Sequence, residues 1–251
     1  MCCTIWAQDK KDSINFDNPH LEEFAYPFSD LNYISPRFDR VNQNNGTYYN
    51  TYLLRTVLTI PHIPLHFRID LPFATSNASG KAITGLDDIS LRSVFVFHQY
   101  KRWLSGAALK LIIPTNSNPN IAVGAWQLNP AYGFLHVFKD SKGSFGLSTD
   151  YRFSFGSNKY NNPNISVLGI APTLDYWGKN CFLGYYPTYT YNFVARSWVI
   201  PFDVEFGYQF IKKWWASAEY IVPMGNNKPF KDEFGIKLRH NFSRAGAIMD
   251  K

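Results

Sequence analysis

Charged side chains recur two residues apart in several segments of this 251-residue chain. The pairs are Arg68 with Asp70, Asp150 with Arg152, Asp203 with Glu205, and Lys237 with Arg239. In an extended strand, residues i and i+2 point to the same face. Charges held away from bulk water must be paired or hydrated. These faces could therefore hold an ion-pair network or line a polar path for a solute.

The residues that could carry catalysis are not spaced for it. A lipid hydrolase can carry its catalytic histidine and serine two residues apart on one strand. None of the six histidines has a serine at that spacing. No G-x-S-x-G motif occurs, and Gly80-Lys81 lacks the first glycine and the Ser/Thr of a P-loop. Asp87 and Asp88 would point to opposite faces of a strand, which makes them a poor acid/base pair. We expect no catalytic residue, with an outer-membrane lipid hydrolase kept as an alternative.

Composition argues against several other classes of protein. The three cysteines, Cys2, Cys3 and Cys181, form no C-x-x-C pair, so neither a metal site nor a cofactor is expected. The net charge is +6, but the basic residues are scattered, which disfavours nucleic-acid binding. No stretch approaches the roughly 18 apolar residues of a membrane-spanning helix.

Segments that alternate apolar and polar residues run through most of the chain and predict strands. In "FGLSTDYRFSFG", residues 145–156, Phe145, Tyr151 and Phe155 oppose Asp150 and Arg152. The predicted strands are residues 50–60, 64–74, 86–98, 103–113, 125–139, 144–156, 165–176, 181–193, 198–211, 213–223 and 232–242.

The connections between these segments are mostly short and long in turn, as in outer-membrane barrels. By this alternation, residues 193–197 should form a long connection, but the segment is short. The first hairpin connection, residues 61–64, is short, so another strand must precede residue 50, and the best candidate lies within residues 28–40. The sequence thus predicts an all-β, antiparallel transmembrane β-barrel of about 12 strands, in the bacterial outer membrane, with both termini in the periplasm.

Alternation alone leaves open which face meets lipid, because a soluble lipocalin-like barrel has the same period with its apolar face inside. Long strands and their number favour a membrane barrel. Aromatic residues also crowd the strand ends, as in interfacial belts. They are Tyr100, Trp103, Tyr176, Trp177, the tyrosines from 185 to 191, Trp198, Trp214 and Trp215.

On the barrel interpretation, the charged face lines the lumen. The candidate lining residues are Arg55, Arg68, Asp70, Asp88, Arg92, Asp150, Arg152, Asp203, Glu205, Glu219, Lys237 and Arg239. Asp203 and Glu205 should face Lys237 and Arg239 from two strands away. Closure of the last strand onto the first should bring Lys237 and Arg239 near the first strand. The set could plug a narrow lumen or select a solute.

The chain ends suggest a processed membrane protein. Residues 1–8 resemble the end of a secretory signal peptide, residues 9–27 would be a periplasmic segment, residues 28–242 the barrel and residues 243–251 a tail. The expected partners are outer-membrane lipid, including lipopolysaccharide, and a small-molecule solute. Nothing in the sequence points to a particular protein partner.

Four pieces in order resemble the bacterial outer-membrane barrel family described as phenol meta-pathway degradation proteins or transporters. They are "NTYLLRTVLTIPHIPLHFRIDLPFAT", "GLDDISLRSVFVF", "LKLIIPTNSNPNIAVGAWQLNPAYGF" and "SWVIPFDVEFGYQF". The resemblance implies a barrel for small hydrophobic or aromatic compounds and assigns no catalytic residue. We therefore expect a passive, porin-like channel or transporter. A non-transporting barrel with a plugged lumen and a soluble binder are the alternatives.

Overall fold

In the computed structural model of this chain, the described residues are 31–60, 63, 65–77, 81–100, 102–115, 118–139, 142–156, 160, 164–178, 180–211, 213–225 and 228–244. The predicted signal-peptide remnant, the segment 9–27 and all but the first two residues of the predicted tail lie outside this set. No helix among the described residues is long and apolar enough to span a membrane.

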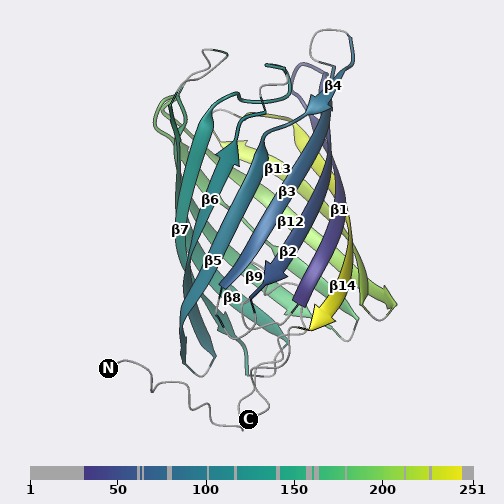
Figure 1. Cartoon of the computed structure of the whole chain (residues 1–251), viewed down its shortest axis with the longest axis vertical. Helices are drawn as coiled ribbons and strands as arrows, with labels where there is room; N and C mark the ends of the chain where they lie inside the picture. The colour runs from purple at the N-terminus through teal and green to yellow at the C-terminus, as the bar shows by residue number, and fades with distance from the viewer. Residues whose placement is uncertain are drawn as a thin grey trace.

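The described chain folds into fourteen β-strands (Figure 1). They are β1 (Leu31–Asn42), β2 (Tyr48–Thr59), β3 (Leu65–Ser76), β4 (Ile83–Leu86), β5 (Ile89–Tyr100), β6 (Trp103–Ile113), β7 (Trp126–Val137), β8 (Gly143–Phe155), β9 (Ser166–Trp177), β10 (Cys181–Tyr185), β11 (Tyr189–Asn192), β12 (Ser197–Ile211), β13 (Trp214–Gly225) and β14 (Asp232–Arg244). The predicted strand within residues 28–40 is β1, and it comes first.

Each strand pairs antiparallel with its neighbours, and β14 pairs with β1 to close the sheet. Two strand positions are each divided between two consecutive strands: β4 and β5 both pair with β3, and β10 and β11 both pair with β9 and β12. The result is a closed antiparallel barrel of twelve strand positions, which confirms the predicted fold class. The strands are visibly tilted against the barrel axis (Figure 1), as closure of a sheet requires.

A proline lies opposite the first interruption and within the second. The break between β4 and β5 lies opposite Pro72 of β3, which has no N–H to donate, and the Asp87 N–H donates to the Pro72 carbonyl instead (3.0 Å). The break between β10 and β11 contains Pro187. Pro172, by contrast, stays in register opposite Leu147 within β9.

The two rims of the barrel differ in their connections. The rim where β1 begins and β14 ends is called the terminal rim, and it lies at the bottom of Figure 1. Connections there span two to five residues, whereas those at the opposite loop rim span four to twelve. The connection after β11, residues 193–196, is the shortest at the loop rim, and Arg196 in it adopts a positive φ of 49°.

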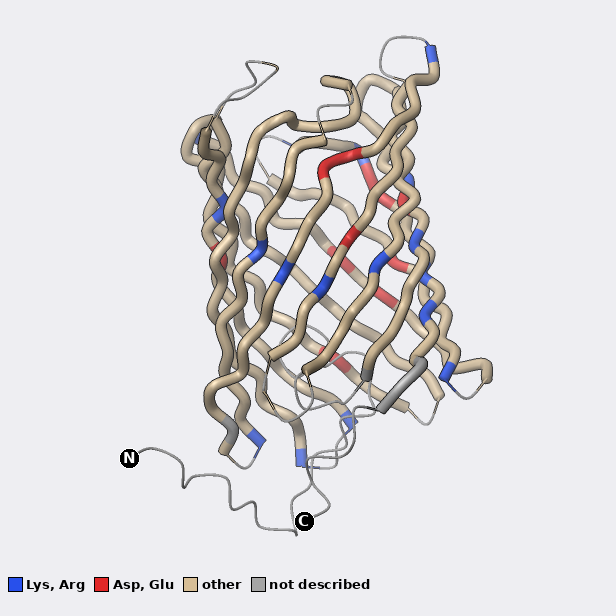
Figure 2. Tube along the Cα trace, in the orientation of Figure 1, with Lys and Arg blue, Asp and Glu red and all other residues tan. Residues whose placement is uncertain are grey.

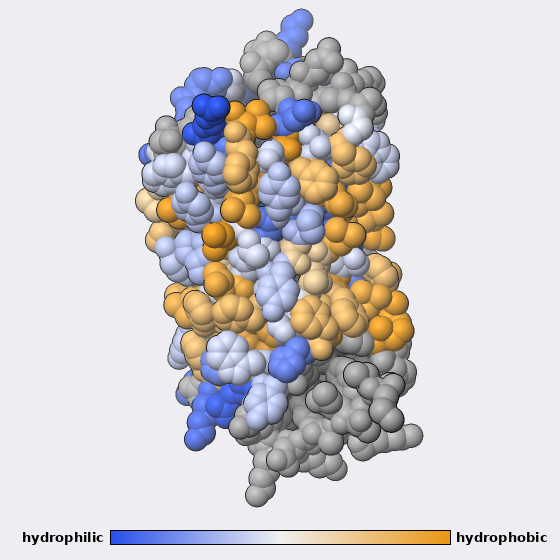
Figure 3. All heavy atoms as spheres, turned by 90° about the vertical axis from the view of Figure 1, so that its left-hand side faces the viewer, coloured by the Kyte–Doolittle hydropathy of each residue, from blue (hydrophilic) through white to orange (hydrophobic). Residues whose placement is uncertain are grey.

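The outward face is apolar and aromatic. Along β12, Phe202, Phe206, Tyr208 and Phe210 all project outward and are exposed. In the face shown in Figure 3, most of the strongly hydrophilic residues lie toward the ends of the barrel. At the terminal rim, the ring centroids of Trp103 and His136, and those of Trp214 and His240, lie 4.4 Å apart. The outer surface is therefore an apolar band with aromatic rings near its edge.

Candidate functional site

The charged side chains of the barrel gather on its inner face, and the strand period explains why. Phe67, Leu91, Leu109 and Tyr151 are exposed on the outside. Their sequence neighbours therefore project into the lumen. The predicted lining residues that the structure places there are Arg55, Arg68, Asp70, Arg92, Asp150, Arg152, Asp203, Glu205, Glu219, Lys237 and Arg239.

One wall of the lumen is rich in carboxylates, and we call it the acidic wall. It comprises Asp39 of β1, Asp203 and Glu205 of β12, Glu219 of β13 and Glu233 of β14. Two cations cross-link it. The Lys237 Nζ lies 2.8 Å from Glu205 and 3.3 Å from Glu219. Arg37 lies 2.6 Å from Asp39, 2.7 Å from Glu219 and 3.7 Å from Glu233.

The predicted cluster of Asp203, Glu205, Lys237 and Arg239 is thus brought together only in part. Lys237 does reach Glu205, and Ser217 also donates to that carboxylate (2.6 Å). The guanidinium of Arg239 instead lies 4.1 Å from the centre of the Tyr33 ring and donates to Asn241 (2.8 Å). Closure of β14 onto β1 places Lys237 opposite Arg37, so the last strand does bring its cations to the first strand.

The other wall is rich in cations, and we call it the basic wall. It comprises Arg55 of β2, Arg68 of β3, Arg92 of β5, Lys110 of β6 and Arg152 of β8. Asp70 lies 2.9 Å from Arg55 and 2.7 Å from Arg68. In Figure 2 the basic residues form a row at mid-height across the near wall, and acidic residues lie on the wall behind. The lumen is therefore electrostatically polarised from side to side.

A cavity of about 400 Å³ lies between these walls. Its lining mixes charged residues from both walls with the aromatic side chains of Tyr33, Phe182 and Trp215. A cavity of this volume falls in the range that accommodates small molecules. Among the described residues, no group of three or more His, Cys, Asp and Glu is placed to hold a metal ion.

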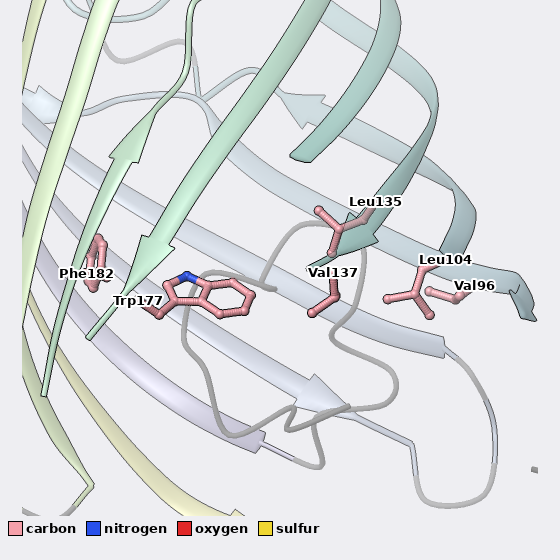
Figure 4. Close-up of a cluster of buried hydrophobic side chains, with 6 residues drawn as sticks. All are labelled: Val96, Leu104, Leu135, Val137, Trp177 and Phe182. Atoms are coloured by element: carbon pink, nitrogen blue, oxygen red, sulfur yellow. The ribbon is translucent and has the colours of Figure 1, made fainter. Parts of the chain in front are cut away.

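The terminal end of the lumen is lined by apolar side chains, which we call the apolar collar (Figure 4). It comprises Val96, Leu104, Leu135, Val137, Trp177 and Phe182, with Trp215 packed against it. Trp177, Tyr186 and Trp215 were expected in the outer aromatic belt, and for these three residues the prediction is wrong, because they face the lumen. Trp177 is only 4% exposed, whereas its neighbour Tyr176 is 61% exposed on the outer face. Composition alone does not distinguish the two faces when both sides of a strand end carry aromatic residues.

Asp88 does not sit on a strand of the lumen wall. It lies in the break between β4 and β5, where its carboxylate accepts hydrogen bonds from the N–H groups of Thr115 (3.2 Å) and Val123 (3.0 Å). Burial raises the pKa of Asp88, and these backbone N–H groups act in the opposite direction. The residue therefore anchors the connection between β6 and β7 at the loop rim.

Sequence reasoning missed five charged residues that face the lumen: Arg37, Asp39, Lys110, Asp175 and Glu233. For Lys110 the signal was present, since it alternates with Leu109 and Leu111. Asp175 is buried and accepts hydrogen bonds from Ser144 (3.1 Å) and Tyr186 (2.8 Å). Asp175 likewise alternates with the outward Leu174 and Tyr176, so its inward direction was predictable, whereas its hydrogen-bond partners depend on neighbouring strands.

Comparisons with known proteins agree with the fold. No protein-family model and no curated protein matches the sequence. The structure is similar to an outer membrane channel from Pseudomonas putida F1, with a TM-score of 0.70 and 14% identity over 84% of this chain and 96% of that chain. The KdgM porin (TM-score 0.59, 13% identity) and the NanC porin (TM-score 0.59, 9% identity) each cover 84% of this chain and 99% of their own. At these identities the likeness supports the shared barrel architecture.

Proposed function

We propose that the protein is a passive channel of the bacterial outer membrane, through which small solutes diffuse along the charged lumen. The observation that carries the proposal is the placement of the two faces in a closed barrel: the apolar face points outward and the charges point inward. A soluble barrel would bury the apolar face instead. The similar solved barrels are an outer membrane channel and two porins, which supports this role.

Both termini lie in the periplasm in this proposal. Short connections belong to the periplasmic side of outer-membrane barrels and longer loops to the outside. The terminal rim has the shorter connections. β1 begins at this rim and β14 ends there.

The lumen chemistry favours polar or charged solutes over the hydrophobic or aromatic compounds that the family resemblance implies. Charged side chains from both walls line the cavity, and the apolar collar lies at the terminal end of the lumen. A hydrophobic solute would have to pass ionised groups that are more stable when hydrated or paired.

A barrel without transport is the second candidate, because the apolar collar is almost fully buried. Leu104 is 0% exposed and Val137 is 1% exposed. Such a collar could belong to a lumen that is closed at the terminal end. The two candidates make different predictions for ion conductance.

The test combines membrane fractionation with electrical recording. The proposal expects recovery in the outer-membrane fraction, a gel mobility that shifts on boiling, and discrete current steps in a planar bilayer. Boiled protein is the control and should give no steps. A folded barrel without current would support the plugged alternative. Recovery without detergent and without a mobility shift would contradict both.

A further inference from the structure

The connection between β6 and β7 is the longest at the loop rim, and its residues 118–125, which we call the strap, are folded and packed. The N–H groups of Ile121 and Ala122 donate to the Asn118 carbonyl, at 3.0 and 2.9 Å. Ile121 is 7% exposed, and Ala122 and Ala125 are each 2% exposed. A loop that extends into solvent leaves such side chains in water, so the strap packs against the barrel.

On one side the strap reaches β2. Tyr49 lies near the start of that strand, and its side chain projects inward because Tyr52, three residues further, is exposed on the outer face. The Tyr49 hydroxyl lies 3.0 Å from the Ile121 carbonyl and 2.6 Å from the Asp87 carboxylate. β2 stands three strand positions away from β6. The strap therefore leaves its own strands and runs along the inner side of the loop rim.

On the other side the strap meets the connection between β8 and β9. The ring of Tyr160 lies against Gly124, where a Cβ would collide with it, and Gly124 has a positive φ of 74° that glycine adopts readily. β2 and β8 occupy the second and seventh of the twelve strand positions. Tyr49 and Tyr160 thus belong to elements rooted on nearly opposite sides of the barrel, and the strap spans the mouth between them.

We propose that the strap is a lid across the loop mouth that limits the size of solutes entering the lumen, and that Tyr49 and Asp88 hold it in place. This inference rests on the proposed channel function. The Asp88 carboxylate binds the N–H of Thr115 before the strap and of Val123 within it. Hydrogen bonds to a carboxylate are stronger than those between neutral groups. None of these contacts belongs to the strand ladders, so the lid can open locally while the barrel stays closed.

The first test measures whether Tyr49 and Asp88 hold the strap. Tyr49→Phe/Asp88→Ala is the release variant. Tyr48→Phe/Asp232→Ala is the matched control at the same rim, where Tyr48 packs under Arg40 and Asp232 accepts from Asn42 (2.6 Å).

The readout is maleimide labelling of Ile121→Cys in folded barrel whose Cys2, Cys3 and Cys181 are serine, with the exposed Asn120→Cys as reference. We expect slow labelling at position 121 in the otherwise unchanged barrel and in the control. The release variant should label about tenfold faster, as loss of several hydrogen bonds predicts.

The second test measures whether the strap limits solute size. Ser217 lines the cavity, and Ser217→Cys in lipid vesicles is treated with a small charged maleimide or with the same group on a polyethylene glycol chain. The ratio of the two labelling rates cancels the local reactivity of the thiol. We expect this ratio to shift about tenfold toward the bulky reagent in the release variant, if the same hydrogen bonds hold the mouth closed. The control should leave it unchanged.

The outcomes separate this inference from the proposed function. Labelling at position 121 as fast as at position 120 before release would overturn the packed strap. Faster labelling at position 121 with an unchanged rate ratio at position 217 would overturn its role in size selection. Either result leaves the channel intact if current steps appear in the planar bilayer. Absence of current, in the barrel with the strap held and in the release variant, would overturn the channel and with it the role of the strap in solute entry.

Discussion

Arg37 of β1 reaches past β14 to Glu219 of β13, with 2.7 Å between the guanidinium and the carboxylate. These residues are far apart in the sequence, and the strand between them is the last of the barrel. The ion pair therefore fastens the seam where the closing strand meets the first strand. Glu219 is also held by Lys237 of β14, so three strands share one carboxylate.

Replacement of Arg37 should weaken this seam. In Arg37→Met, the carboxylates of Asp39, Glu219 and Glu233 would face one another without their shared cation. Removing one partner of a largely buried pair costs about 3 kcal/mol. Urea unfolding of the barrel in lipid vesicles measures the change. Arg40→Met, on the outward side of the same strand, is the control, and equal unfolding midpoints for the two variants would contradict the role given to Arg37.

Gly207 should not tolerate a side chain. A Cβ at this position would collide with the ring of Phe182 in the apolar collar. We expect Gly207→Ala to destabilise the barrel by about 1–3 kcal/mol, as overpacking does. Adding Phe182→Leu should recover part of this loss, measured by the temperature at which the folded gel band disappears. If the second substitution only added to the damage, the contact would not be the cause.

A charged side chain on the outer face should impair folding of the barrel into a membrane. Phe206 is 53% exposed on the outside of β12, where an arginine near the middle of a bilayer costs about 2–4 kcal/mol. Phe206→Arg should therefore lower folding into vesicles, whereas Asn120→Arg in an exposed connection should not. On the soluble-barrel alternative, Phe206→Arg would be harmless or helpful to solubility.

Of two neighbouring aromatic residues at the end of β9, only the inward one should affect conductance. Trp177 belongs to the apolar collar, and Tyr176 faces outward. Trp177→Ala should raise the single-channel current by widening the terminal end of the lumen, and Tyr176→Ala should leave it unchanged. Equal currents for the two variants would show that the collar does not limit the path.

The two-residue alternation of apolar and polar side chains predicted most of the fold, because it is a local property of the chain. Charged pairs such as Asp203 with Glu205 lie on one face in the structure because residues two apart in a strand must. The alternation of connection lengths also required a strand before residue 50, and β1 occupies that place. The break at Asp87–Asp88 was less apparent because it lies opposite Pro72 of the neighbouring strand β3, whereas Pro187 lies within the break between β10 and β11.

The contacts within the site could not be predicted in the same way. The pair of Arg37 and Glu219 depends on the register of three strands at the seam, and Arg239 packs on Tyr33 only because β14 closes on β1. Inward placement of Trp177 is a further case, because an aromatic residue at a strand end suits either face. The register between distant strands decides such contacts, and a two-residue period does not distinguish registers that differ by two residues.

The central claim is that the charged face meets water and the apolar face meets lipid. Ser217→Cys and Leu109→Cys test it in a background in which Cys2, Cys3 and Cys181 are serine, with Asn120→Cys as the exposed reference. Folded barrel in lipid vesicles is treated with a charged, water-soluble maleimide. We expect labelling at position 217 and at the reference, and protection at position 109. Labelling of position 109 as fast as the reference, with position 217 protected, would contradict the account.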